Sequence, residues 1–169
     1  MAAKTVRAEP EATEAPVRPV LEVLLLYEDL GTAIRARHLL DRLPGQLGRE
    51  TDFNTRLWRL DLLGQPLLAE QAAIEAAAAD VIILSLHGRG DLPTDVRNWL
   101  NRWLDHKEDR PYALAASLDA EPTEARDRSP LVDGLRQFAA SAGVDLFFGV
   151  GRTLVPSTQP FTDSPSAFC

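Results

Sequence analysis

The chain has 169 residues, of which 45% are hydrophobic and 25% are charged, and its formal net charge is −7. This length and composition are typical of one globular domain with a core of ordinary size. The acidic excess argues against nucleic acid as a partner, because an acidic domain repels phosphate backbones. No apolar run approaches the roughly 20 residues that span a bilayer, and the N-terminus lacks the apolar segment of a secretory signal. We therefore expect a cytoplasmic protein that contacts no membrane.

Composition divides the chain into three parts. Residues 1–18 are rich in Ala, Glu and Pro without a periodic apolar pattern, which predicts a disordered N-terminal tail. Residues 19–152 alternate between apolar runs and amphipathic segments, which predicts one folded domain. Residues 153–169 contain three prolines and little periodicity, so we expect an extended C-terminal tail in place of a fifth helix.

Five segments predict β-strands. Four are nearly continuous apolar runs, as in parallel strands that helices cover on both faces; these are residues 20–27, 80–86, 111–118 and 144–150. Residues 55–61 (Thr-Arg-Leu-Trp-Arg-Leu-Asp) are more polar and follow a predicted loop over 46–54, so they suit a strand at the edge of the sheet.

Four segments between these strands predict helices. The first covers residues 30–43 and stops at Pro44-Gly45, and the second is the alanine-rich stretch 67–79. Pro93 opens a third helix, on which one apolar stripe contains Trp99 and Trp103. This stripe predicts helix–sheet packing and is also a candidate contact for a homodimer. Ser129 as N-cap and Gly143 as terminator bound the fourth helix.

This alternation predicts an α/β fold, a doubly wound three-layer αβα sandwich with right-handed crossovers. The polar second strand at the edge favours a five-stranded parallel sheet in the order 2-1-3-4-5. Ligands of such folds bind outside the carboxyl ends of the strands at the point where the strand order reverses. Here that point lies between the first and third strands, and the loops 27–32, 85–93 and 118–127 would line it.

The segment 79–105 resembles part of the NADPH-dependent FMN reductases, a family of the flavodoxin-like superfamily. It has Ala79-Asp80 before the strand, a glycine-containing loop after it and a proline that starts a helix. The resemblance implies that this loop contacts the isoalloxazine ring of FMN. Combined with the phosphate position at the start of the first helix, it gives as candidate cofactor-binding residues Gly31, Thr32, Ser85, His87, Gly88, Arg89 and Gly90.

The loop after the first strand differs from a flavin phosphate loop, because Glu28 and Asp29 place two carboxylates there. At about 4 Å and an effective dielectric constant near 20, each contact with a phosphate would cost on the order of 4 kcal/mol. The acidic pair resembles the receiver domains of two-component systems, which carry two acids at this place. Ser85 or a neighbour replaces the phospho-accepting Asp, which implies a receiver-like shell without phosphotransfer. Glu28, Asp29 and Asp91 are candidate ligands of a weak Mg²⁺ site.

Two functions remain open on these grounds. The first is a non-catalytic flavodoxin-like or receiver-like module that binds a partner protein or a small ligand at the switch-point face, because no set of catalytic residues is complete. The alternative is an FMN-dependent NAD(P)H oxidoreductase with an altered phosphate loop. Glu28 and Asp29 distinguish the two functions, since in the reductase both carboxylates must point away from the crevice.

Overall fold

The computed structural model describes residues 19–42, 51–109, 111–119, 128–150 and 153–156. The predicted N-terminal tail and nearly all of the predicted C-terminal tail lie outside these residues, as does Pro44-Gly45. Among the described residues, no helix combines the length and the apolar character needed to cross a membrane.

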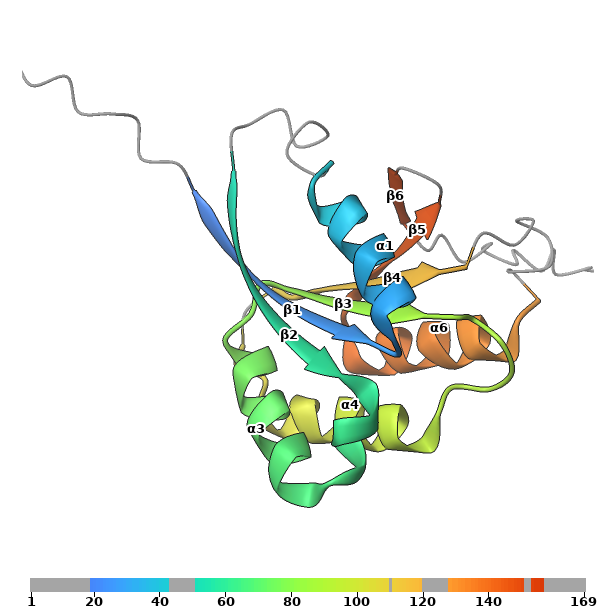
Figure 1. Cartoon of the computed structure of the whole chain (residues 1–169). Helices are drawn as coiled ribbons and strands as arrows, with labels where there is room; N and C mark the ends of the chain where they lie inside the picture. Colours follow the sequence, from blue (N-terminus) through green and yellow to red (C-terminus); the bar gives the residue numbers. More distant parts are fainter. Residues whose placement is uncertain (1–18, 43–50, 110, 120–127, 151–152, 157–169) are drawn as a thin grey trace, which may run out of the picture.

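The described strands form one sheet in the order β2-β1-β3-β4-β5-β6 (Figure 1). Their bounds are β1 Val20–Tyr27, β2 Asp52–Arg59, β3 Val81–Leu86, β4 Ala113–Leu118, β5 Asp145–Val150 and β6 Thr153–Pro156. The first five strands pair in parallel, which confirms the predicted order 2-1-3-4-5 and the doubly wound α/β fold. The sixth strand pairs antiparallel with β5, where only an extended tail was predicted.

Helices cover the sheet unevenly. The helical segments are α1 Leu30–Leu40, the 3₁₀ helix η1 Leu60–Gly64, α3 Pro66–Ala77, α4 Thr94–His106 and α6 Pro130–Ala142. In Figure 1, α3, α4 and α6 lie against one face of the sheet and α1 lies against the other. The three layers of the predicted sandwich are therefore present, with a single described helix in one of them.

The sheet has a hydrophobic core on each face, because successive side chains of a strand point to opposite faces. On β1, Leu24 and Leu26 belong to the larger core beneath α3, α4 and α6. Their neighbours Val23 and Leu25 belong to a smaller core beneath α1. Both faces of the central strands are thus buried, as their continuous apolar sequences predict.

The second strand begins earlier than predicted. β2 starts at Asp52, inside the predicted loop 46–54, because its first residues pair with the start of β1. There the Asn54 amide donates to the Glu22 carboxylate at 2.9 Å, so a polar strand gains a polar partner. The strand also ends earlier, since Leu60 turns into η1 and is buried there.

The helix ends agree with the capping signals in part. α6 ends before Gly143, whose φ of 63° lies in the left-handed region that favours glycine. Ser129 precedes α6 as predicted, but its hydroxyl makes no capping bond. It donates instead to the carbonyl oxygen of Gly88 at 3.3 Å, which connects the start of α6 to the loop after β3.

The tryptophan stripe of α4 is part of the core. Trp99 is 1% exposed and Trp103 is fully buried, and Trp103 meets Tyr112 edge-on with 5.5 Å between ring centroids. The predicted helix–sheet packing is therefore confirmed. The same burial leaves neither tryptophan at the surface for a contact between copies of the chain, and the homodimer itself stays a prediction.

Candidate functional site

The candidate site lies where β1, β3 and β4 end, as the reversal of strand order predicts. β1 leads directly into α1 through Glu28 and Asp29. Asp29 is the N-cap of α1: its Oδ1 accepts the Thr32 N–H at 2.9 Å, and the Thr32 hydroxyl accepts the Asp29 N–H at 2.9 Å. This reciprocal capping box satisfies two backbone donors at the helix start and fixes the turn.

Thr32 and Ser85 are both buried and have structural roles. The Thr32 hydroxyl also accepts the Glu28 N–H at 3.0 Å and donates to the Asp29 carbonyl oxygen at 2.8 Å. A hydroxyl has one donor and two acceptor positions, so all three are used. The Ser85 hydroxyl donates to the Thr32 carbonyl oxygen at 2.7 Å, which fastens β3 to the first turn of α1.

His87 bridges the crevice between two carboxylates. Its Nε2 lies 2.8 Å from Asp29 Oδ2, and its Nδ1 lies 3.0 Å from Asp119 Oδ2, directly after β4. Its backbone N–H donates to Glu28 Oε2 at 2.6 Å, and that oxygen is also 3.9 Å from Nε2. A neutral imidazole has a single N–H, so only the imidazolium donates to both Asp29 and Asp119.

These contacts shift the pKa values of all three groups. Hydrogen bonds to Asp29 and Asp119 raise the pKa of His87 above its ordinary value of 6.5. The pKa of Asp29 is lowered, first by the Thr32 N–H and then by His87. Burial acts to raise the pKa of Asp119, but hydrogen bonds from His87 and Arg35 outweigh it and lower the value. The arrangement therefore favours charged side chains on both sides of His87.

Arg35 connects this network to the sheet. Its guanidinium pairs with Asp119 Oδ1 and donates to the Leu86 carbonyl oxygen at 2.7 Å and to the Ser117 carbonyl oxygen at 3.4 Å. One cation thus contacts the last residues of β3 and β4 together with Asp119. The arginine comes from α1, one turn after Thr32, so α1 supplies groups to both ends of the network.

The structure places the predicted cofactor-binding residues in two groups. Gly31 lies in the first turn of α1 beside Asp29, while Arg89 is exposed on the loop after β3. Gly88 and Gly90 have φ values of 80° and 71°, which other residues rarely adopt. A Cβ at Gly88 would also lie 3.4 Å from Cβ of Leu118. The loop after β3 therefore packs closely against the end of β4.

The predicted magnesium ligands are not brought together. Among the described residues, no group of three or more His, Cys, Asp or Glu side chains is placed to hold a metal ion. Asp29 uses one carboxylate oxygen for Thr32 and the other for His87, while Glu28 accepts the His87 N–H. These carboxylates serve the chain's own donors, and Asp91 makes no third partner for them.

Sequence analysis missed Asp119 and Arg35 as site residues. Asp119 begins the loop 118–127, which was predicted to line the switch point but from which no candidate residue was named; residues 120–127 lie outside the described part of the chain. Its position directly after a strand, at the same sheet edge as His87, is the signal that would have found it. Arg35 follows Thr32 at helical spacing, which places both residues on one face of α1.

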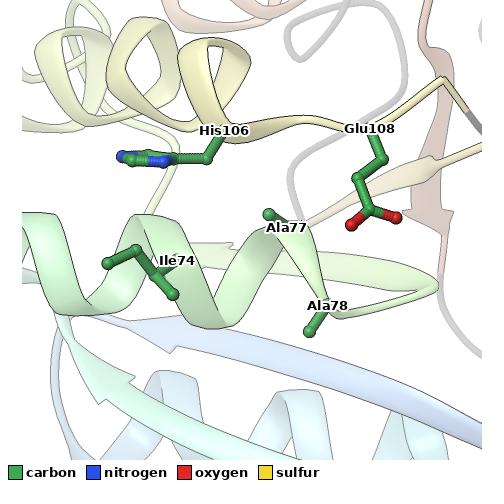
Figure 2. A pocket seen from close by; sticks show the side chains of 5 residues that line it. All are labelled: Ile74, Ala77, Ala78, His106 and Glu108. Atoms are coloured by element: carbon green, nitrogen blue, oxygen red, sulfur yellow. The ribbon is translucent and has the colours of Figure 1, made fainter.

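A separate hollow of about 490 Å³ lies between α3 and the end of α4 (Figure 2). It is lined by Ile74, Ala77, Ala78, His106 and Glu108. His106 Nε2 is 2.7 Å from Glu70 Oε1, and Arg102 donates to the other oxygen of Glu70 at 2.9 Å. This network joins α4 to α3, so we assign His106 a structural role.

No protein-family model matches the chain, and no curated protein is similar to it. The geometry at the carboxyl ends of β1, β3 and β4 therefore carries the functional argument.

The Thr32 hydroxyl provides a direct test of the capping box. We expect Thr32→Val to lower the free energy of unfolding by about 2 kcal/mol, because it leaves the part-buried N–H groups of Glu28 and Asp29 without their acceptor. Thr32→Ser keeps the hydroxyl and should cost about half as much. Urea unfolding followed by circular dichroism measures both values. Equal losses in the two variants would contradict the role given to the hydroxyl.

The His87 bridge predicts a pH dependence. Because its folded-state pKa is raised, His87 contributes stability that is fully present below its unfolded value of about 6.5 and is lost as pH rises through the folded value. The stability difference between the wild type and His87→Gln should therefore shrink over that range. NMR titration of the His87 ring should give a lower pKa in Asp119→Asn than in the wild type.

Asp91→Asn is the matched control for this titration, because it removes an exposed carboxylate from the loop that follows His87. It should leave the pKa of His87 close to the wild-type value. A wild-type ring that titrates below about 6.5 would show that the two carboxylates do not hold the proton.

Proposed function

We propose that this chain is a cytoplasmic, non-catalytic binding module that takes a partner protein or a small ligand on the face formed by the ends of β1, β3 and β4. The observation that carries the proposal is the His87 bridge between Asp29 and Asp119. An acid–base catalyst needs a ring nitrogen within reach of its substrate. Here carboxylates of the chain itself occupy both nitrogens.

The polarity of this face favours a partner protein over a small ligand. The side chains of Asp29 and His87 are 54% and 43% exposed, so charged groups reach the surface instead of lining an enclosed cavity. Small-molecule sites are usually concave and mostly apolar, with few polar groups. Exposed charges around a partly buried network suit the polar rim of a protein interface, where they steer and orient the partner.

The positions of Glu28 and Asp29 count against the flavin alternative. Both carboxylates contact His87 across the crevice, so they point toward the place that the FMN phosphate would take. A phosphate site at a helix start needs free backbone N–H groups. The N–H groups of Glu28, Asp29 and Thr32 all have acceptors within the chain.

Titration with FMN tests the alternative. We expect no quenching of flavin fluorescence and no shift of the visible absorbance up to about 100-fold excess over a typical micromolar dissociation constant. Saturable quenching in the micromolar range would contradict the proposal and favour the NAD(P)H oxidoreductase. In that case Glu28→Gln and Asp29→Asn should strengthen FMN binding, because each removes a charge that repels the phosphate.

Site-specific photo-cross-linking tests for the partner protein itself. A photoreactive residue at position 89 lies exposed on the proposed face, whereas one at Asp105 lies exposed near the end of α4 as the matched control. We expect position 89, and not position 105, to capture one defined protein in extracts of the source cells. Equal capture at both positions, or none, would argue against docking on this face.

A further inference from the structure

β2 is an open edge of the sheet. Among the described strands it pairs with β1 alone, while β1, β3, β4 and β5 each have two neighbours (Figure 1). It has eight residues and contains no proline. A long edge strand presents unpaired N–H and C=O groups, which natural proteins cover or protect. A strand from a partner could form hydrogen bonds with these backbone groups.

Apolar side chains lie exposed beside this edge. Leu57 of β2 is 62% exposed and Ile34 of α1 is 48% exposed. Ile34 and Leu57 line a groove of about 360 Å³ between α1 and β2. Phe53 and Thr55 share the α1 face of the strand with Leu57, because they alternate with it by two residues.

We propose that β2 pairs antiparallel with β2 of a second copy of the chain, about a twofold axis through Thr55. In this register each Leu57 lies opposite Phe53 of the second copy, on the face that carries α1. Two apolar cross-strand pairs then flank the axis and cover Leu57, the most exposed apolar side chain of the strand. The two sheets become one continuous sheet, and both open edges are satisfied.

The charges of the strand permit this register and disfavour one about Arg56. Arg56 is exposed and no other residue of the described chain pairs with it, whereas Asn54 already holds the Glu22 carboxylate at 2.9 Å. Pairing about Thr55 places Arg56 opposite Asn54 of the second copy and beside that carboxylate; its diagonal neighbours are Asp52 and Arg56 of the second copy. A shift of the axis to Arg56 would set the two Arg56 side chains directly against each other, and directly opposite like charges are destabilising. A shift of the axis to Asn54 would place Leu57 opposite Thr51, so Leu57 would lose its apolar partner Phe53.

Sedimentation velocity over a range from about 1 to about 200 µM measures the association. One strand pair with a small apolar patch buries less than a standard interface, so we expect a dissociation constant of roughly 10–100 µM. The wild type should move from monomer to dimer over this range, while Leu57→Lys should stay monomeric. A wild type that remains monomeric throughout would overturn the proposal.

Disulfide cross-linking tests the register. In a Cys169→Ser background, Thr55→Cys places two thiols opposite each other at the axis, within the Cα separation of about 4.4–6.8 Å that a disulfide needs. Arg59→Cys is the matched control, because each Arg59 lies opposite residue 51 of the second copy, so the two introduced thiols are far apart. We expect oxidation to link the position-55 variant far faster. Equal rates, or a dimer that links at neither position, would show that the copies meet elsewhere.

Discussion

The turn between β1 and α1 is the element on which the rest of the candidate site depends. The reciprocal bonds between Asp29 and Thr32 fix the start of the helix, and the remaining oxygen of Asp29 then points to His87. Because Thr32 is completely buried, its hydroxyl and carbonyl connect the turn to Glu28 and to Ser85 of β3. A local capping motif thereby connects the ends of two strands that are adjacent in the sheet but far apart in the sequence.

From this turn the polar network crosses three strand ends. Asp29, His87, Asp119 and Arg35 form an alternating series of negative and positive groups, and each group neutralises its neighbours. Such a series rigidifies the loops because every member restrains the next. The hydrogen bonds of this network also occupy the side chains that could otherwise activate a substrate or hold a phosphate. The same contacts that stabilise the loops thus support the proposal of a surface that binds and does not catalyse.

Sequence patterns predicted the central strands well, because a strand that is buried on both faces has a nearly continuous apolar sequence, as β3 does. They predicted β2 less accurately, since its first residues depend on pairing with Glu22 and its neighbours on β1, which no local pattern records. The location of the site followed from strand order alone. The partners of His87 did not, because Asp29 and Asp119 are separated from it by 58 and 32 positions and meet it only in the folded chain.

The short strand β6 has a consequence for how far the sheet can grow. It has four residues, runs antiparallel to β5 and ends at Pro156, which has no N–H to offer a further strand. Among the described strands the two edges of the sheet are therefore unequal, and β2 is the longer of the two edge strands. An association that uses identical edges about a twofold axis closes on itself at two copies. The proposed pairing through β2 therefore ends at two copies and gives no open-ended β filament.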